Sequence, residues 1–316
     1  MNVLKIAFMG TPEFAVASLA ALLEAGYDVV AVVTAPDRPA GRGRKLRQSA
    51  VKQYALSKEL PVLQPTNLKD PEFLDSLVAF GVNLQVVVAF RMLPVAIWSF
   101  PEFGTFNLHA SLLPDYRGAA PINWAIINGE TTTGATTFFI NENIDTGNIL
   151  LQESLEIGPE ENAGELHDRL MELGQELLVR TVGLIEQGEV KAKKQNEADP
   201  DKKAPKLNRD NSKINWNQPA ETLHNLIRGL SPYPGAWTQM WNNNTDGMQC
   251  KVFKATLTDR KSGTDPGQLI LDHGRLFAAT SDFDLELLEI QLEGKRRMQV
   301  SDLLNGFELK ENAYLL

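Results

Sequence analysis

"LKIAFMGTPEFAVASLAALLEAGYDVVAVVT", residues Leu4–Thr34, contains two apolar runs separated by a stretch with helical periodicity. Leu4–Met9 and Asp28–Thr34 have the length and apolar character of buried strands. Between them, Pro12–Glu24 repeats its apolar residues at helical spacing, with Thr11 as the expected N-cap. A strand, a helix and a second strand in this order predict a βαβ unit with a parallel sheet.

Three further apolar runs continue this pattern along the first half of the chain. They are Leu84–Ala89, Thr105–His109 and Ala135–Ile140. The first run is almost uniform in valine, which is typical of a strand that helices cover on both faces. We therefore expect an α/β fold with a doubly wound parallel sheet.

A long helix and a polar segment are expected to end the first domain. Asn162 and Glu165 have the spacing of a capping box, and the leucines that follow recur every three or four residues up to about Gly188. Residues 191–208 then lose apolar periodicity and are rich in lysine, which is typical of a basic linker. The first domain is therefore predicted over residues 1–190.

Residues 209–316 predict a smaller, mostly β domain. Its short strand-like runs are separated by Gly and Asp turns, a spacing that favours a small closed sheet. We expect an OB-like β-barrel. The runs are Gln249–Ala255, Gly267–Leu271, Leu276–Ala279 and Leu285–Ile290.

The composition excludes several classes of protein. The chain has 316 residues, of which 43% are hydrophobic, so it is long enough for two domains. Its net charge of −9 argues against a protein that coats nucleic acid indiscriminately, although it allows a local basic contact. The single cysteine, Cys250, excludes an internal disulfide and favours a reducing compartment, so we expect a cytoplasmic location. No apolar run is long enough to cross a bilayer, and we expect no membrane association.

Two polar residues lie within the apolar strand Thr105–His109. Residues two apart in a strand share a face, so Asn107 and His109 are expected to point the same way. They lie near the carboxyl end of the strand, where open α/β sheets bind ligands. Asp145 lies in a glycine-containing loop after the next apolar strand, and adjacent strand ends would bring its carboxylate to the imidazole.

Asn, His and Asp side chains at one place suit acyl transfer to an amine. The Asn107 amide would donate to the developing oxyanion, and His109, oriented by Asp145, would manage the proton that the amine loses. No covalent nucleophile is required. The alternative is a buried histidine that is hydrogen-bonded for structural reasons only.

Three other kinds of site fit the sequence less well. Ser111 follows the strand, but the Gly-x-Ser-x-Gly elbow of serine hydrolases is absent. The turn after the first strand lacks the glycine spacing of dinucleotide-binding proteins, so we expect a Rossmann-like fold that binds no NAD. The four histidines have no metal-ligand spacing, and we expect no metal.

The stretches "FNLHASLLPDYRGAAP" and "IDTGNIL" together resemble the active-site signature of the folate-dependent formyltransferases. This resemblance implies that Asn107, His109 and Asp145 are catalytic and that the formyl donor is 10-formyltetrahydrofolate. It also implies that the turn after the strand and the stretch "VVVAFRMLP" bind the folate. The folate-binding residues implied are Ser111, Leu112, Leu113, Pro114, Phe90 and Met92.

Three other stretches resemble the branch of this family that formylates methionyl-initiator tRNA. They are "GTPEFAVASL", "TAPDRPAGRGRKL" and "APKLNRDNSKINW" with "IRGLSPYPGAW", so the resemblance extends over essentially the whole chain. It implies that the basic loop and the C-terminal domain contact the tRNA. The tRNA-binding residues implied are Arg38, Arg42, Arg44, Lys45 and Lys206.

The basic loop separates the remaining hypotheses. Residues 37–47 hold five basic residues and one acidic residue, a charge of +4, which fits either a solvated loop or a loop that orders on binding phosphates. A sugar-nucleotide formyltransferase or a formyltetrahydrofolate hydrolase would share the Asn–His–Asp set but would not explain this loop. An RNA-binding protein without catalytic activity is the alternative from another class. We expect a monomer.

Overall fold

The computed structural model describes residues 3–40, 45–197, 199, 202–242 and 247–316. Contacts divide the chain into two compact units. The first comprises Met1–Gly118, Thr133–Leu155 and Asp168–Lys203, and the second comprises Ala119–Thr132, Glu156–His167 and Ala204–Leu316. Two short segments of the predicted first domain, Ala119–Thr132 and Glu156–His167, therefore belong to the second unit, and the domain boundaries at residues 190 and 208 stay a prediction.

A seven-stranded, mostly parallel sheet forms the centre of the first unit, in the order β10-β9-β7-β6-β1-β2-β5. The five strands from β5 to β7 are parallel to their neighbours, so in chain order they run 3-2-1-4-5 across the sheet. β9 is antiparallel to β7. The bounds are β1 Lys5–Gly10, β2 Asp28–Val33, β5 Val62–Leu63, β6 Leu84–Val88, β7 Thr105–His109, β9 Thr132–Phe139 and β10 Ile149–Glu156.

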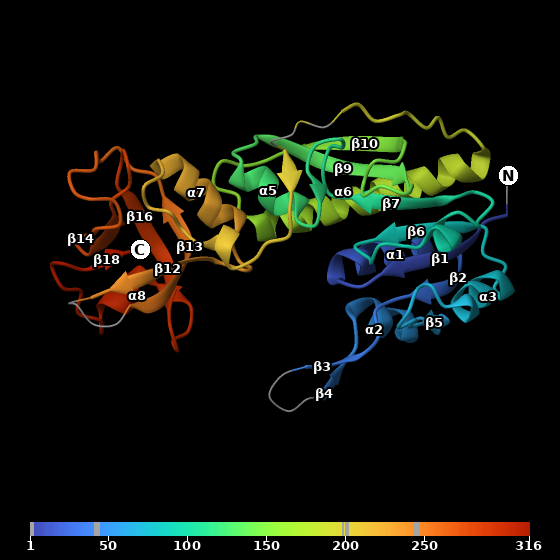
Figure 1. The fold of residues 1–316 in the computed structure, drawn as a ribbon, viewed down its shortest axis with the longest axis horizontal. Helices are drawn as coiled ribbons and strands as arrows, with labels where there is room; N and C mark the ends of the chain where they lie inside the picture. Colours follow the sequence, from blue (N-terminus) through green and yellow to red (C-terminus); the bar gives the residue numbers. More distant parts are fainter. Residues whose placement is uncertain (1–2, 41–44, 198, 200–201, 243–246) are drawn as a thin grey trace. The chain divides into compact units, whose positions relative to one another are not determined.

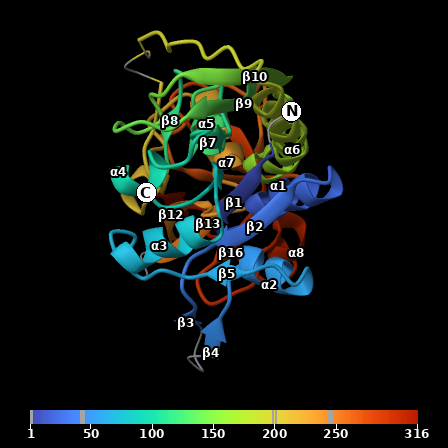
Figure 2. The same cartoon turned by 90° about the vertical axis from the view of Figure 1, so that its right-hand side faces the viewer.

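Helices cover both faces of this sheet. Figure 2 views the sheet with β10 at the top and β5 at the bottom, with α1 and α6 on one side and α3 and α4 on the other. Leu108 of β7 lies against Gly174 of α6, whereas Val87 of β6 packs in one core cluster with Phe73 of α3 and Ile97 of α4. The helices are α1 Glu13–Glu24, α2 Ala50–Ser57, α3 Pro71–Ala79, α4 Val95–Trp98 and α6 Ala163–Gln187.

The sequence predicted the N-terminal cap of one helix correctly and that of another incorrectly. The capping box of α6 is present: the Asn162 amide donates to the Glu165 carboxylate at 2.9 Å, and the Glu165 amide donates to Oδ1 of Asn162 at 3.1 Å. The expected N-cap of α1, Thr11, is wrong by one residue. Pro12 occupies the N-cap, because its carbonyl accepts the first bond of the helix from Ala15, and no side chain caps this end.

The described parts of the basic loop, residues 37–40 and 45–47, contain a two-stranded β-ribbon. β3 Arg38–Ala40 and β4 Lys45–Arg47 are antiparallel, with Arg38 opposite Arg47. Figure 1 shows this ribbon projecting from the body of the first unit. Arg42 and Arg44 lie outside the described residues, and only the backbone of Lys45 is described.

The second unit is a separate β domain that also contains the helices α5, α7 and α8. Its strands follow the order β14-β15-β16-β13-β12-β18, and β17 pairs with β16. The two ends of this order are also hydrogen-bonded: Leu269 donates to the Ala313 carbonyl at 2.9 Å and Leu315 donates to the Gly267 carbonyl at 2.8 Å. The bounds are α5 Pro121–Ile127, α7 Ala220–Gly229, β12 Ala236–Trp241, β13 Met248–Thr256, β14 Leu269–Asp272, β15 Arg275–Ala278, β16 Leu285–Leu292, β17 Met298–Gln299, α8 Val300–Leu304 and β18 Tyr314–Leu315.

The segment that follows α6 is attached to the first unit, although its composition is that of a linker. Lys193 and Ile149 exchange two backbone hydrogen bonds of 2.7 and 2.8 Å, and the side chain of Gln195 is buried. Further on, β11 Lys203–Ala204 pairs with β8 Arg117–Gly118. Within the described part of the chain, no helix has the length and apolar character needed to cross a membrane.

Candidate active site

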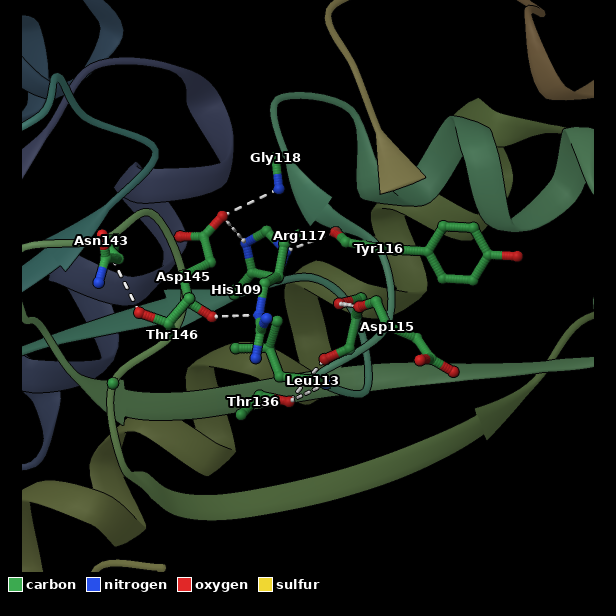
Figure 3. Close-up of polar contacts among 12 residues, drawn as sticks. His109, Leu113, Asp115, Tyr116, Arg117, Gly118, Thr136, Asn143, Asp145 and Thr146 are labelled. Carbon is green, nitrogen blue, oxygen red and sulfur yellow. Dashed lines mark hydrogen bonds and ion pairs between the residues drawn. The ribbon is translucent and has the colours of Figure 1, made fainter. Parts of the chain in front are cut away.

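The His109 side chain is held between a carbonyl group and a carboxylate. Its Nε2 lies 3.0 Å from the Tyr116 carbonyl oxygen, and its Nδ1 lies 3.9 Å from Oδ2 of Asp145 (Figure 3). A carbonyl oxygen can only accept a hydrogen bond, so Nε2 must carry a hydrogen and donate it. In the neutral ring Nδ1 is then the basic nitrogen, and it faces the Asp145 carboxylate. The His109 residue is only 7% exposed, so the orientation of its ring is fixed by its surroundings.

Asp145 reaches His109 by a route that the sequence did not predict. The expectation was that adjacent strand ends would bring the two together, but β9 is antiparallel to β7, so its last residue, Phe139, pairs with Phe106 near the start of β7. The loop after β9 instead folds back, and Oδ2 of Asp145 accepts a 2.9 Å hydrogen bond from the Gly118 amide. The proximity was predicted correctly and the reason for it was wrong.

Asn107 precedes His109 by two residues on β7 and is half-buried. Its Oδ1 atom is buried and has no hydrogen-bond partner among the described residues. A buried acceptor without a partner is costly in a folded protein unless a ligand atom supplies the missing hydrogen bond. Asn107 is therefore suited to contact a polar substrate atom beside His109.

The turn Ser111–Pro114 is fixed by hydrogen bonds to β9 and β10. Thr136 of β9 donates to the Ser111 carbonyl at 2.6 Å and accepts from the Leu113 amide at 3.1 Å. Gln152 of β10 donates to the Leu113 carbonyl at 2.8 Å. Ser111 and Leu113 are buried, whereas Leu112 and Pro114 are half-buried.

The hydroxyl of Ser111 donates to the Asp115 carbonyl at 2.7 Å. It thereby stabilises its own turn, which agrees with a structural role rather than with that of a nucleophile activated by His109. The only cysteine, Cys250, is buried, and burial raises the pKa of its thiol to about 12. Neither residue offers an activated nucleophile.

Phe90 and Met92 follow β6 at the carboxyl edge of the sheet. This edge lies next to the end of β1, where the strand order reverses, and ligands of open α/β sheets bind at such a position. Phe90 is half-buried and packs on the sheet core, whereas Met92 is 67% exposed. Arg91 between them donates to the Pro65 carbonyl at 2.8 Å, and burial is the main cause that lowers the pKa of its guanidinium.

The base of the β3–β4 ribbon is anchored by three polar side chains. Nζ of Lys52 in α2 donates to Oδ2 of Asp37 and to Oε1 of Gln64, each at 2.7 Å. Nε2 of Gln64 donates to Oδ1 of Asp37 and to the Ala35 carbonyl, each at 2.8 Å. The hydrogen bond from Lys52 is the main cause that lowers the pKa of the Asp37 carboxyl. We call Asp37, Lys52 and Gln64 the ribbon anchor.

The described tRNA-binding candidates present exposed side chains. Arg38 is exposed on β3 of the first unit, and Lys206 is exposed in the second unit, where its carbonyl accepts a hydrogen bond from Asn211 at 3.1 Å. No group of three or more His, Cys, Asp or Glu side chains that could hold a metal ion occurs among the residues that the structure describes.

Several residues at the site carried no sequence signal. Tyr116 and Gly118 contact His109 and Asp145 through backbone atoms, which any residue type possesses. Arg117 and Gln195 hydrogen-bond to the Asp145 carbonyl. Arg117 lies inside a motif quoted for other reasons, and Gln195 lies in a polar segment with no periodicity, so neither could be singled out.

Comparisons with known proteins agree with this architecture. The family model described as formyl transferase matches residues 4–182, and the model described as formyl transferase, C-terminal domain, matches residues 206–308. The chain therefore belongs to the formyl transferase family. The methionyl-tRNA formyltransferase of Flavobacterium johnsoniae is 52% identical, covering 99% of both chains, and that of Bacteroides fragilis is 48% identical, covering 98% of this chain and 96% of the relative.

A solved structure shares the fold at lower identity. It is the N-formyltransferase from Helicobacter canadensis in complex with folinic acid and dTDP-3-aminofucose, with a TM-score of 0.65 and 23% identity. The match covers 90% of this chain and 98% of that one. At this identity the comparison shows that the fold is shared.

Proposed function

We propose that this chain transfers the formyl group of 10-formyltetrahydrofolate to the amino group of methionyl-initiator tRNA, for translation initiation. The observation that carries the proposal is the His109 ring, fixed with Nε2 on the Tyr116 carbonyl and Nδ1 facing Asp145, beside the unpartnered Oδ1 of Asn107. The methionyl-tRNA formyltransferases that match along the full chain support the choice of acceptor.

The reaction exchanges one bond for another at the formyl carbon. The neutral amine nitrogen attacks this carbon, and its bond to N10 of the folate breaks. A reference α-amino group has a pKa of roughly 8, so part of the acceptor amine is protonated at neutral pH and must lose a proton before attack. After attack the amine nitrogen loses a further proton and N10 gains one, which leaves formylated methionyl-tRNA and tetrahydrofolate.

Asn107, His109 and Asp145 each have a distinct part in this reaction. Nδ1 of His109 accepts the proton of the amine and returns it to N10, because Nε2 is committed to Tyr116. Asp145 stabilises the imidazolium that forms. The Asn107 amide donates to the oxyanion while its Oδ1 accepts from the amine N–H, so both ends of the carboxamide contact the reacting groups. This division needs no covalent intermediate.

The donor lies along the carboxyl edge of the sheet. The folate contacts that we propose are Ser111, Leu112, Leu113 and Pro114 of the fixed turn, and Phe90 and Met92 after β6. An exposed Met92 side chain is adaptable and can cover an aromatic pterin. Sites for ligands of this size are mostly apolar and largely preformed, with a few fixed polar groups, and the hydrogen-bonded turn meets the second requirement.

The acceptor is held by basic side chains in both units. Arg38 is in β3 and Lys45 is in β4, Arg42 and Arg44 stand between these strands in the sequence, and Lys206 lies at the start of the second unit. Arginine forks match phosphate oxygens well, and the positive ribbon provides a local attraction on a chain of net charge −9. The ribbon favours this acceptor over a sugar nucleotide.

The same proposal includes the finer architecture. We assign residues 1–190 to a Rossmann-like, doubly wound catalytic domain, 191–208 to a basic linker, and 209–316 to a tRNA-binding domain. Hydrogen bonds between the two ends of the C-terminal strand order support closure into an OB-like barrel. We also propose a monomer, and a translation substrate implies the cytoplasm.

The test supplies 10-formyltetrahydrofolate labelled in the formyl group with a panel of acceptors. We expect label on methionyl-initiator tRNA. Label on an amino sugar nucleotide would favour a sugar N-formyltransferase, and label released as formate without an acceptor would favour a hydrolase. Binding of tRNA with no transfer of label would favour an RNA-binding protein.

A further inference from the structure

Two side chains from distant parts of the chain hold the turn that carries Asp145. Arg117 donates from Nε to the Asp145 carbonyl oxygen at 2.9 Å. Gln195 donates from Nε2 to the same oxygen at 3.0 Å and to the Gly147 carbonyl at 2.7 Å. Oε1 of Gln195 also accepts from Arg117, at 3.2 Å from Nε and 2.5 Å from Nη2. The three groups form one closed set of hydrogen bonds.

This set holds a backbone conformation that needs support. Asp145 has a φ of 53°, in the left-handed region that residues other than glycine rarely adopt. Such conformations cost free energy and persist only where their surroundings determine them. Gln195 is 9% exposed although its neighbours Lys194 and Asn196 are exposed, so this one side chain is directed into the protein.

We propose that Gln195 and Arg117 are positioning residues of the formyl transfer site. They fix the carbonyl side of the turn, the Gly118 amide fixes the carboxylate side, and together these contacts keep Oδ2 of Asp145 facing Nδ1 of His109. Both act through the backbone of the turn. The kinetic part of this inference rests on the proposed function, since it concerns the same reaction.

The geometry distinguishes positioning from general stabilisation. A side chain that only stabilised the fold would change the fraction of folded protein and leave the turnover of the folded fraction intact. Loss of these hydrogen bonds instead frees the turn to relax from its left-handed conformation, which moves the carboxylate relative to the imidazole. Displacements of about 1 Å at reacting groups can cost about 100-fold in rate.

The experiment compares Gln195→Leu and Gln195→Glu with Lys194→Leu, an exposed neighbour, as the matched control. Gln195→Leu removes all the hydrogen bonds of the side chain, and Gln195→Glu keeps the acceptor for Arg117 but removes both donors. We expect kcat to fall by about 10- to 100-fold in both, with KM for 10-formyltetrahydrofolate unchanged. In the double variant Arg117→Met with Gln195→Leu, the loss should be smaller than the product of the single losses, because both act on one turn.

A second readout needs no substrate. In nitrogen-15 spectra of the free full-length protein, the His109 imidazole resonances should move in Gln195→Leu as they move in Asp145→Asn, and should stay in place in Lys194→Leu. Unchanged kcat, or unchanged imidazole resonances with a lower melting temperature, would overturn the inference. If the wild-type chain does not formylate methionyl-tRNA, the proposed function fails, and the spectra alone decide this inference.

Discussion

Asp145 faces His109 through Nδ1 at 3.9 Å, while Nε2 of the same ring donates to the Tyr116 carbonyl at 3.0 Å. The two nitrogens of the ring therefore have different partners and different duties. Nε2 sets the orientation, and Nδ1 is the nitrogen at which a proton can arrive and be stabilised. Figure 3 shows the carboxylate and the carbonyl on different sides of the ring.

This arrangement predicts how substitutions at His109 and Asp145 affect turnover. His109→Gln removes the proton acceptor, and we expect kcat to fall by about 100- to 10,000-fold, the usual range for losing general acid–base help. Asp145→Asn keeps the size of the side chain but removes the charge that stabilises the imidazolium, so its kcat should also fall. In both variants kcat and kcat/KM should fall by the same factor in steady-state assays. A variant at position 109 with wild-type kcat would contradict the assigned role.

The sequence could predict the parts of this site that depend on local spacing. The strand Thr105–His109 was predicted with its observed bounds, and the two-residue period placed Asn107 and His109 on one face. The capping box of α6 was found because both of its residues lie within one helical turn. The proximity of Asp145 was also predicted, but from adjacent strand ends, whereas β9 is antiparallel to β7 and the loop after it folds back.

What could not be predicted depends on contacts between distant segments. Gln195 lies 50 residues from Asp145 in the chain, and nothing in its own neighbourhood distinguishes it from a solvated glutamine. The ribbon anchor joins Asp37 to Gln64 across 27 residues. Such partners become visible only when the strand order and the course of the loops are known, and periodicity carries no information on either.

Gly147 predicts a test of the Asp145 turn that does not alter any charged group. A Cβ atom at this position would lie 1.6 Å from the carbonyl oxygen of Phe139, so Gly147→Ala must displace the loop. We expect a loss of about 1–3 kcal/mol in the free energy of unfolding, as for other overpacked sites. Because Gly147 also accepts from Gln195, kcat should fall in the fraction that stays folded.

The matched control for this substitution is Gly263→Ala, where an added Cβ would meet no atom within 4 Å. Denaturant unfolding measures the loss in the free energy of unfolding, and turnover per folded molecule measures the fall in kcat. Equal stability of Gly147→Ala and Gly263→Ala would show that the loop accommodates a methyl group and that its close approach to β9 is unimportant.

His224 predicts how the stability of the second unit depends on pH. Burial is the main cause that lowers the pKa of this imidazole, and Glu160, 3.3 Å from Nε2, opposes the shift only in part. The unfolded chain therefore binds a proton more readily than the folded protein does. The contribution of His224 is fully present above the unfolded pKa of about 6.5 and is lost as pH falls below it.

His224→Gln should make the free energy of unfolding less dependent on pH below about 6.5. The difference in slope from the wild-type protein cannot exceed about 1.4 kcal/mol per pH unit, the value for one proton. Urea unfolding at several pH values measures it. His273→Gln is the control, because that side chain is 95% exposed and should leave the slope as it is. Parallel curves for wild type and His224→Gln would contradict the prediction.

The ribbon anchor predicts that Lys52 affects the KM for methionyl-tRNA without contacting the tRNA itself. Lys52 is committed to Asp37 and Gln64 at the base of the β3–β4 ribbon, so Lys52→Met should loosen the ribbon and raise KM for methionyl-tRNA while leaving KM for the folate unchanged. Arg38→Ala should act differently, because we propose that this exposed arginine contacts phosphate directly. Its loss should reduce the slope of log tRNA affinity against log salt concentration by slightly less than ~1 unit.

The control for Lys52→Met is Lys58→Met, which removes the same charge from an exposed side chain just beyond the end of α2. If only net charge attracts the tRNA, both variants should weaken its use equally and both should change the salt slope. If the anchor sets the direction of the ribbon, Lys52→Met alone should raise KM for tRNA, and Asp37→Asn should reproduce its effect. Combining Lys52→Met with Asp37→Asn should then add little, because Lys52→Met already removes the hydrogen bond and ion pair that Asp37→Asn weakens.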